Sequence, residues 1–441
     1  MRGGKTVYDP IHGSISVDGP FLDLLDRHEM QRLRHVRQLG LSNTVFPGAN
    51  HTRFEHSLGV YHLAGRMADA LGMTKEEADI LRTAAMLHDV CHPPFSHTLE
   101  RTMEDLTGCD HMEMSRRLIF GEVPSFRERD KGFFEGTEPI SVLLEDSGIP
   151  PERVCDLIIN PVSKVGWFEE GGENKQSFFA SKDYAHQIIH GPVDADQMDY
   201  LMRDAHYTGL NQGAIDTERI LSQMAIHNDQ VVLRKGAITA AEGLMVARSL
   251  MYSTVYYHKT VKVIEAMLRR AVEISGLDMS ELYLMTDADL ITALLSSGGK
   301  SADLMRSVMN RRLYKKCLTV YSIDADDDFK ASLVRFSTPD GRRQLEEEIA
   351  SSAGVDPRDV IADIPSESAL LSKVRIGKTD VSIIDSEDRV RSITKYSSVA
   401  KALQSRGAID WAVMISAPEK DQEAVRRAAV RALSFDDTDR A

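Results

Sequence analysis

The sequence predicts a mainly α-helical protein with a smaller C-terminal α+β region. Apolar residues recur at helical spacing from residue 20 to about 315. Beyond residue 316 the pattern changes to shorter segments separated by Asp, Ser and Gly. Because 441 residues exceed the usual size of one domain, we expect a helical domain over 1–315 and an α+β region over 316–441.

Composition limits the partners. The 53 Lys and Arg residues face 67 Asp and Glu residues, and a net charge of -14 disfavours a general affinity for nucleic acids or anionic membranes. The 4 cysteines show no Cys-x-x-Cys spacing, which suits a reducing cytosol. No run approaches the ~18 to 20 apolar residues of a membrane span, and the N-terminus lacks the apolar stretch of a signal peptide. We therefore expect a cytoplasmic protein with no membrane partner.

Two helices carry the histidines that matter most. Thr74-Lys75-Glu76-Glu77 is a capping-box pattern that opens a helix, and Pro93-Pro94 stops it, so His88-Asp89 falls in the last turn. On the preceding helix His56 lies on an apolar face. Both histidines are expected to point inward, with these apolar residues on their faces: Val60, Leu63, Ala64 and Met67 on the first helix, Leu81, Ala84 and Ala85 on the second.

A His-Asp pair at the buried end of a helix is costly unless a charge partner or a metal compensates it. His56 upstream and Asp196 downstream complete a mixed nitrogen and oxygen ligand set with His88 and Asp89. Such a set suits a divalent cation, and Mn, Fe, Mg, Co, Ni and Zn are all compatible with it. A bound cation lowers the pKa of its water, so the sequence predicts a metal-dependent phosphohydrolase.

Phosphate groups need positive charge and hydrogen-bond donors. Thr239-Ala240-Ala241-Glu242 opens a predicted long helix to about Ser275, on which Arg248, Tyr252, Tyr256 and Lys259 share one face. Together with Arg53, three members of that face (Arg248, Tyr256 and Lys259) are the candidate phosphate ligands. Amphipathic covering of the core is the alternative interpretation of the same face. Arg203 is interpreted as a salt-bridge partner of Asp199 at i,i+4.

The C-terminal region is predicted to contain a small sheet. Residues 381–384, 390–393 and 411–415 are short apolar runs bounded by turn residues, which is typical of strands. Nothing in their composition indicates a function.

Three ordered motifs resemble the deoxynucleoside triphosphate triphosphohydrolases of the HD-domain superfamily. They are His51-Thr52-Arg53-Phe54-Glu55-His56, the stretch from Leu87-His88-Asp89 to Phe95-Ser96-His97, and the stretch from Val193-Asp194-Ala195-Asp196 to Arg203-Asp204. The resemblance covers residues 5–270 and implies a helical HD-domain core. It makes His56, His88, Asp89 and Asp196 the metal ligands, the same four that the residues themselves indicate.

The resemblance also implies a reaction. Enzymes of this type attack the α-phosphorus of a deoxynucleoside triphosphate with a metal-held water and release triphosphate and a nucleoside. It assigns His97 as the acid for the leaving 5′ oxygen, with His92, Glu100 and His111 around it. Polar support of the loop after Pro94 is the alternative role for these four. The matching positions make Tyr200 and Asp204 sugar contacts, where the tyrosine would exclude a 2′-hydroxyl, and Gln38 and Leu39 base contacts, with dGTP as a candidate substrate.

A second, regulatory nucleotide site at a subunit interface is implied by a partial match of Lys5, Asp26, Gln31, Arg34 and Arg234. Gly236 stands where relatives have a lysine, and residues 26–34 could equally form a solvated charged helix face. A homo-oligomer, dimer or tetramer, is expected from the resemblance alone.

Several positions depart from the family pattern: Gln197 replaces a basic residue, Tyr257 an amide, Cys91 and Pro93 small residues, and Glu100 an Asp. These changes leave two alternatives open: a phosphohydrolase of another nucleotide, and a nucleotide-sensing protein without turnover. The complete ligand set argues against the second.

Overall fold

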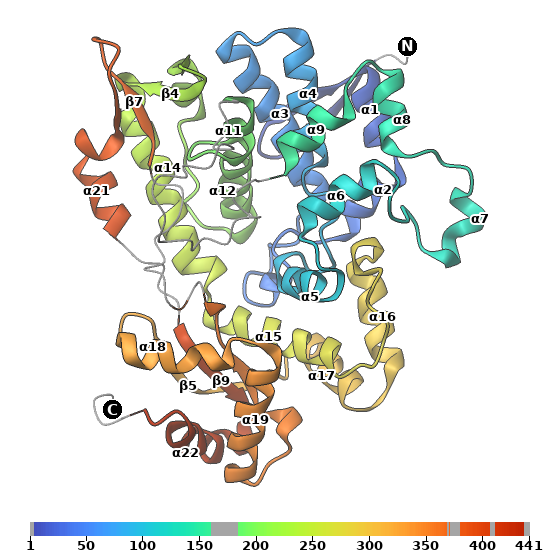
Figure 1. The fold of residues 1–441 in the computed structure, drawn as a ribbon, viewed down its shortest axis with the longest axis vertical. Helices are drawn as coiled ribbons and strands as arrows, with labels where there is room; N and C mark the ends of the chain where they lie inside the picture. The colour runs from blue at the N-terminus through green and yellow to red at the C-terminus, as the bar shows by residue number, and fades with distance from the viewer. Residues whose placement is uncertain (1–3, 160–183, 368–369, 371–379, 406–410, 436–441) are drawn as a thin grey trace.

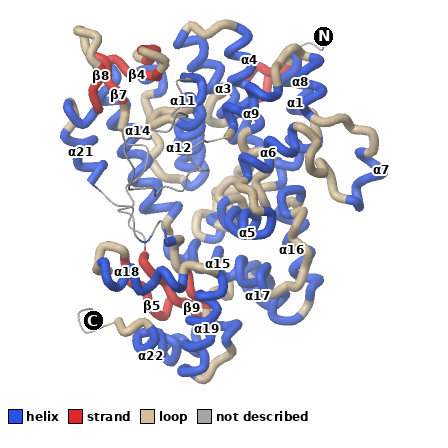
Figure 2. Tube along the Cα trace, viewed as in Figure 1, coloured by secondary structure: helices blue, strands red, loops and turns tan. Residues whose placement is uncertain are grey.

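The computed structural model describes residues 4–159, 184–367, 370, 380–405 and 411–435. A large helical body forms the upper part of the molecule in Figure 1, and a smaller lobe of helices and strands lies below it and ends near the C-terminus. Within these residues the strands form three small sheets (Figure 2), and the predicted mainly α class is confirmed.

The helical body begins with the hairpin β1 (Lys5–Asp9) and β2 (Gly13–Val17). The helices that follow up to the end of the body are α1 (Gly19–Leu25), α2 (His28–Arg32), α3 (Arg53–Leu71), α4 (Lys75–Leu87), α5 (His97–Thr107), α6 (His111–Ile119), α7 (Lys131–Phe134), α8 (Ile140–Asp146), α9 (Pro151–Ile158), α11 (Tyr184–His190), α12 (Ala195–Thr208), α13 (Thr217–Ser222), α14 (Ile238–Met251), α15 (Lys259–Glu273), α16 (Asp287–Ser297) and α17 (Gly299–Met309). A second hairpin, β3 (Met224–His227) and β4 (Gln230–Arg234), precedes α14.

The C-terminal segments, in chain order, are β5 (Lys315–Tyr321), α18 (Asp327–Leu333), α19 (Pro339–Ala353), β6 (Ile361–Asp363), β7 (Ser382–Ile384), β8 (Val390–Ser392), α21 (Ser398–Ser405), β9 (Trp411–Ala417) and α22 (Gln422–Ala432). Strands β5 and β6 both pair antiparallel with β9, which gives the order β5-β9-β6. Helices α19 and α22 pack on each other and form the lobe's own apolar core with this sheet.

The prediction that the three C-terminal runs share one small sheet is wrong. Strand β7 pairs parallel with β4 and antiparallel with β8, so these two strands extend the hairpin of the helical body. Only β9 joins the sheet of the lobe. The side chains of Val381, Ile383 and Ile393 are buried in the large core. Apolar runs show that strands form, but the pairing depends on contacts between residues about 150 positions apart.

Helix α4 confirms the predicted start, because Thr74 caps it and forms a capping box with Glu77. It ends at Leu87, so His88 is its C-cap residue and Asp89 follows the helix. The predicted single helix from Thr239 to Ser275 is wrong. Helix α14 ends at Met251, a π-helical turn spans Tyr252–Tyr256, and α15 begins at Lys259.

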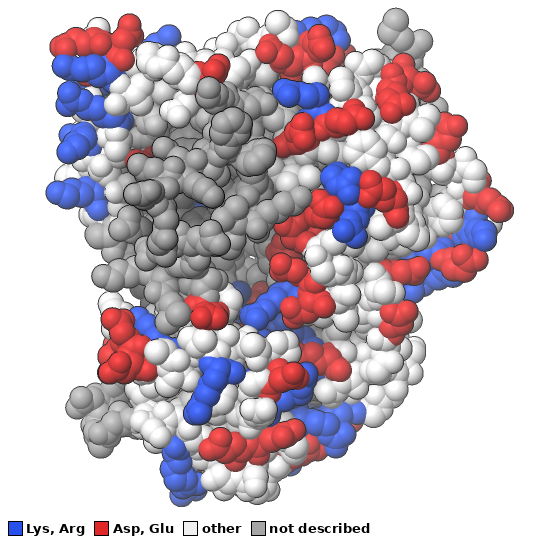
Figure 3. Space-filling model, in the orientation of Figure 1, with Lys and Arg blue, Asp and Glu red and all other residues white. Residues whose placement is uncertain are grey.

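The described part of the chain contains no helix that is long and apolar enough to cross a membrane. Its 4 cysteines are buried and unpaired. Lys and Arg side chains alternate with Asp and Glu over the face seen in Figure 3, as the acidic but mixed composition leads one to expect.

Candidate active site

The four predicted ligands come together where α3, α4 and α12 meet. Helix α3 packs against both α4 and α12 and presents His56, while Asp196 lies in the first turn of α12. The His56 Nε2 atom lies 3.0 Å from Asp196 Oδ1 and 3.6 Å from Asp89 Oδ2. The His88 Nε2 atom lies 3.4 Å from Asp89 Oδ1 and 3.9 Å from Asp196 Oδ1. The fold thus brings together side chains that are far apart in the sequence: His56, the His88–Asp89 pair and Asp196.

The donor set fits a divalent cation. The His88 ring donates from Nδ1 to the Ala85 carbonyl oxygen at 2.8 Å, so in the neutral tautomer that makes this bond Nε2 is the acceptor. That Nε2 is buried and has no hydrogen-bond partner within the described residues. One ligand atom from each of His56, His88 and Asp196 falls within 4.8 Å of the others. An orphaned buried imidazole nitrogen beside two carboxylates is the arrangement that a cation would satisfy.

A buried carboxylate orients His56 from behind. Asp199 Oδ2 lies 2.7 Å from His56 Nδ1, and Asp199 also accepts from both ends of the Arg203 guanidinium, at 2.9 and 2.8 Å. Arg203 in turn donates to Asp9, so the predicted Asp199–Arg203 pair is confirmed and belongs to a larger network. Gly59 of α3 makes the close approach of α12 feasible, because a Cβ there would lie 1.9 Å from Asp199 Oδ1. Such outer carboxylates fix the orientation of metal-ligating histidines.

Charge is concentrated at this point. Burial lowers the pKa of His56, but its hydrogen bonds to Asp196 and Asp199 outweigh burial and raise that pKa to about 10. Burial also opposes ionisation of Asp89, yet the Arg53 guanidinium and His88 hold its pKa well below the usual range. Asp196 behaves likewise, since His56 outweighs burial and lowers its pKa. The carboxylates are therefore anionic at neutral pH and attract a cation.

The four predicted acid–base residues form a cluster beside Asp89. His92 Nε2 and His111 Nε2 lie 3.3 and 3.9 Å from Asp89 Oδ1. Glu100 bridges His111 and His97, with His97 Nδ1 2.8 Å from Glu100 Oε2. Burial lowers the pKa of His111, but the Glu100 carboxylate outweighs it and raises that pKa, whereas burial drives the pKa of His92 well below its usual value. One histidine of the cluster is thus biased toward the charged form and another toward the neutral form.

A cavity of about 470 Å³ opens beside the His-Asp cluster. This is within the usual size range of small-molecule sites. Most of the predicted site residues line it: Gln38, Leu39, Arg53, His88, Asp89, His92, His97, His111, Asp196, Tyr200, Asp204, Arg248 and Tyr256. His56 lies buried behind the wall, and Glu100 contacts the cavity only through its two histidines.

Arg248 and Tyr256 are fixed by residues of α12. The Gln197 side chain accepts from Arg248 Nη1 at 2.9 Å and donates to the Gly191 carbonyl and to Asp194. Gln197, which departs from the family pattern, therefore orients an arginine in place of supplying a charge. Tyr256 donates to Asp204 Oδ2 at 2.6 Å, while Asp204 Oδ1 is 2.8 Å from His51 Nε2.

Lys259 does not lie in the cavity, so its predicted place on the Arg248 face is wrong. Its side chain is exposed, and its Nζ lies 4.9 Å from the centre of the Tyr321 ring. The π-helical turn and the break at Tyr257 and His258 interrupt the 3.6-residue period, so the spacing of three no longer places Lys259 below Tyr256. Lys262 lines the cavity instead, with its Nζ 3.0 Å from Glu265 Oε2.

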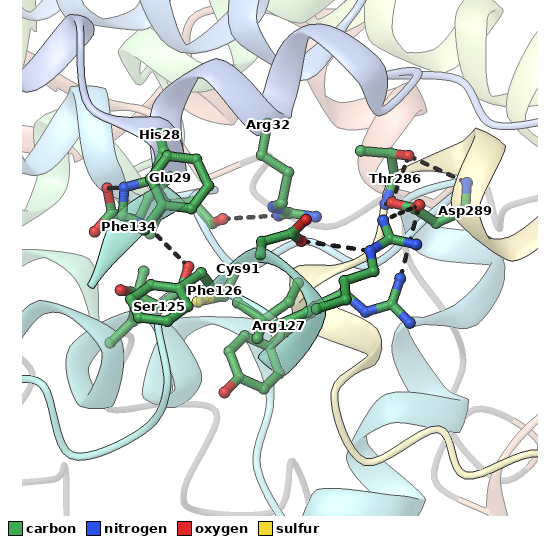
Figure 4. A pocket seen from close by; sticks show the side chains of 16 residues that line it. His28, Glu29, Arg32, Cys91, Ser125, Phe126, Arg127, Phe134, Thr286 and Asp289 are labelled. Atoms are coloured by element: carbon green, nitrogen blue, oxygen red, sulfur yellow. Dashed lines mark hydrogen bonds and ion pairs between the residues drawn. The ribbon is translucent and has the colours of Figure 1, made fainter. Parts of the chain in front are cut away.

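The loop after Asp89 is held from the side away from the cavity. Arg32 donates to the Val90 and His92 carbonyl oxygens at 2.8 Å each and to Met285 O at 2.7 Å. Burial lowers the pKa of Arg32 to about 10, and it remains a cation at neutral pH. A separate cavity of about 250 Å³ lies at this position and is also lined by Cys91 (Figure 4).

Two strained residues follow in the same loop. Phe95 and Ser96 adopt φ values of 58° and 54°, which non-glycine residues rarely do. Asp287 of α16 accepts from the Phe95 N–H at 2.8 Å and the Arg37 N–H at 3.1 Å. The Ser96 hydroxyl accepts from Arg53 Nε at 2.8 Å and donates to Arg37 O at 2.7 Å. These bonds fix the backbone that places His97 at the start of α5.

The predicted regulatory residues are only partly together in one chain. Arg34 Nε donates to Gln31 Oε1 at 2.8 Å, and the Arg34 guanidinium lies 3.5 Å above the Phe54 ring. Lys5 and Asp26 are exposed. Arg234 ends β4, which lies on the opposite side of the helical body from α2 (Figure 1). Within a single chain these five residues do not form one site.

Sequence reasoning missed several residues of the site. It gave no role to Asp9 and His12, although both fall within the part of the chain that the resemblance covers and His12 Nε2 lies 2.7 Å from Asp199 Oδ1. It chose Lys259 as the cavity lysine, whereas Lys262 lines the cavity. It also left Tyr252 out of the substrate-binding residues, although Tyr252 lines the cavity. The predicted i,i+4 pair Asp199–Arg203 was the sequence signal that could have indicated the carboxylate behind His56.

Two family models and several known proteins are similar to this chain. The HD domain model matches residues 53–158, and the model of an HD associated region matches residues 215–441. The uncharacterized protein MJ1154 of Methanocaldococcus jannaschii is 31% identical over 435 residues, which is 97% of this chain and 82% of that protein. The deoxynucleoside triphosphate triphosphohydrolase SAMHD1 homolog of Dictyostelium discoideum is 30% identical over 338 residues, which is 71% of this chain and 60% of that protein.

A crystal structure of a phosphohydrolase from Bacteroides thetaiotaomicron has the same fold, with a TM-score of 0.64, 24% identity, and coverage of 94% of this chain and 100% of that one. The chain therefore belongs to the HD-domain family that carries the HD associated region, and it is a metal-dependent phosphohydrolase. The chain spans less than two thirds of the length of the Dictyostelium relative.

Proposed function

We propose that the protein hydrolyses a deoxynucleoside triphosphate to the deoxynucleoside and inorganic triphosphate, with dGTP as the first candidate substrate. One observation carries the proposal. The orphaned His88 nitrogen and its neighbouring carboxylates open into a cavity whose other wall holds Arg248, Tyr200 and Tyr256. A cation site beside basic and phenolic donors suits a nucleoside polyphosphate.

His56, His88, Asp89 and Asp196 would hold the cation. When bound, it supplies Lewis acidity and lowers the pKa of a coordinated water. Asp199 keeps His56 Nε2 directed at the site, and the Ala85 carbonyl does the same for His88 Nε2. Mn, Fe, Mg, Co, Ni and Zn all suit imidazole and carboxylate donors.

The remaining residues bind and orient the substrate. Arg53 and Arg248 are the proposed phosphate contacts, and Lys262 takes the place that the sequence gave to Lys259. Tyr200 and Asp204 are proposed to contact the sugar, where the Tyr200 ring would leave no room for a 2′-hydroxyl. Gln38 and Leu39 lie on the cavity wall and are the proposed base contacts.

His97 is the proposed acid. Its Nδ1 lies 2.8 Å from Glu100 Oε2, a contact that orients the ring, and Nε2 is the atom that would deliver a proton to the departing 5′ oxygen. Arg53 Nη2 lies 3.2 Å from the same Nε2 and can only donate to it, so the guanidinium would have to leave this nitrogen for a phosphate oxygen before Nε2 carries a proton. His111 and His92 complete the proton environment.

A nucleotide-sensing protein without turnover is the second candidate. The observation in its favour is Gln197, which stands beside Asp196 where a charged residue would strengthen the hold on phosphate. Phosphohydrolysis of another nucleotide is a third candidate, since Tyr257 changes the wall near the base.

A homo-oligomer in which Lys5, Asp26, Gln31 and Arg34 of one subunit approach Arg234 of another would form the regulatory nucleotide site.

Product analysis over the four deoxynucleoside triphosphates and their ribonucleotide counterparts, with each metal in turn, tests the proposal. Triphosphate release from deoxynucleotides alone is expected. Release of pyrophosphate or monophosphate would overturn the proposed reaction. Nucleotide-induced thermal stabilisation with no hydrolysis under any metal would favour the sensor instead.

A further inference from the structure

A second cavity of about 440 Å³ lies next to the proposed active site. It is lined by residues of α5, of α15 and of the C-terminal lobe at α19 and β6. Helix α15 packs against α5 and β6, and β6 packs against α19; α5, α15 and α19 are labelled in Figure 1. His97 and Thr98 line this cavity as well as the catalytic one. The start of α5 therefore separates two cavities.

Arginines dominate the polar lining. Arg101, Arg269, Arg342 and Arg343 face three carboxylates, those of Asp105, Glu273 and Asp363. Among the described residues, Arg269 is paired with Asp363 of the cavity lining at 2.7 Å, and Arg343 is paired with Asp340 outside the lining at 2.5 Å. Arg101 donates to the Ser337 carbonyl at 2.9 Å and forms no ion pair with any described residue. The nearest carboxylate to Arg342 is Glu273, at 4.0 Å.

The arginines also repel one another. The side chain of Arg342 is only 15% exposed. Burial lowers the pKa of Arg342, and the positive charges of Arg101 and Arg269 lower it further, while the carboxylates of Glu273 and Glu346 offset only part of this. The fold thus holds the guanidinium groups of Arg101 and Arg342 at one cavity without a close carboxylate for either. A bound anion would lower the electrostatic free-energy cost of this arrangement.

We propose that this cavity binds the polyphosphate group of a second ligand, either free inorganic polyphosphate or a nucleotide. Planar guanidinium groups form bidentate, charge-assisted hydrogen bonds with phosphate oxygens, which no neutral ligand would match. Leu106 and Leu277, 54% and 37% exposed, give the same cavity an apolar margin against which a nucleoside can lie.

Occupancy would connect the C-terminal lobe to the reaction. Arg101 belongs to α5, which begins with His97, whereas Arg342 belongs to α19 of the lobe. An anion between them ties the lobe to the helix that carries the proposed acid. This coupling rests on the proposed function, but the binding itself does not.

The test is calorimetric titration of metal-free protein in EDTA with inorganic tripolyphosphate, and with a non-hydrolysable deoxynucleoside triphosphate analogue. The double variant R101Q/R342Q should weaken binding by at least ~10-fold, because two charge-assisted contacts are lost. R306Q on α17, an exposed arginine outside the cavity, is the matched control and should bind as the parent does. R101K/R342K should recover part of the affinity, which a folding defect would not allow.

The R248Q background separates the two cavities, because it weakens the proposed active site and leaves the arginine cavity intact. Tripolyphosphate that binds R248Q with parental affinity and fails to bind R101Q/R342Q supports the proposal. If only the nucleotide analogue shows this dependence, the cavity recognises the nucleoside as well. Equal binding to the parent and R101Q/R342Q, or no binding of either ligand to the parent, would overturn the proposal. Arginine-dependent binding without hydrolysis of any nucleotide would refute the proposed function alone.

Discussion

Substitution of Asp196 should abolish metal binding without unfolding the protein. It is the most exposed of the four ligands, 29% accessible, and α12 keeps its N-cap because Asp194 accepts from the Gln197 N–H at 2.7 Å. Loss of a residue that only hydrogen-bonds to a metal ligand lowers metal affinity or activity by ~10 to 100-fold. Because Asp196 is proposed to bind the metal directly, Asp196→Ala should lower both by more than ~100-fold. Metal content by mass spectrometry and nucleotide turnover are the readouts.

Asp328→Ala, in the first turn of α18, is the control for a lost acidic residue near a helix start. It should keep both metal and activity. A D196A protein that retains stoichiometric metal would remove Asp196 from the ligand set.

Asp287 should make stability depend on pH. Burial raises its pKa to about 6, so the folded state holds this proton more tightly than the unfolded state. The resulting stabilisation is present below pH ~4 and is lost as pH rises through 6, which amounts to about 3 kcal/mol for two pKa units. Urea unfolding of the parent and of D287N between pH 4 and 7 measures the difference, and parallel curves would contradict the assignment.

At the scale of elements, the break between α14 and α15 decides which lysine can reach a substrate. Lys262→Ala should raise KM for the nucleotide several-fold with little change in stability, while Lys259→Ala should leave KM unchanged, because only Lys262 lines the cavity. Steady-state kinetics on the two variants checks this. An effect of K259A as large as that of K262A would mean that the helix break closes up in solution.

The same break shows how far sequence patterns reach. Capping at Thr74 and the apolar faces around His56 and His88 depend on neighbours within two turns, and the structure places these residues as the spacing predicts. A π-helical turn inserts its extra residue without a Pro or Gly in Tyr252–Tyr256, so no local signal indicates the change of face. The orientation of Arg248 by Gln197 is likewise invisible, because it joins residues 51 positions apart.

At the scale of the whole molecule, the C-terminal region is part of the helical body as well as a lobe. Ile383 of β7 is fully buried in the large core, and the Arg270 guanidinium forms a buried ion pair with Glu346 of α19. Composition alone indicated a boundary near residue 316, since it detects the change to short strands but not the return of β7 to β4.

This arrangement predicts which elements will show faster hydrogen exchange after a cavity-forming substitution in each core. Ile383→Ala should destabilise the protein by about 2–5 kcal/mol and increase hydrogen exchange in β4 and α14. Ile349→Ala, in the core of the lobe, is the matched variant and should increase exchange in α19 and β9 first. Exchange confined to β7 and β8 in I383A would show that these strands are only an appendage.

The central claim, hydrolysis at the α-phosphorus beside the His56–His88–Asp89–Asp196 site, is tested most directly by turnover in H₂¹⁸O. Mass spectrometry of the products from dGTP or whichever deoxynucleotide is hydrolysed should find one ¹⁸O in inorganic triphosphate and none in the deoxynucleoside. Label in the deoxynucleoside, or release of monophosphate or pyrophosphate, would contradict the account.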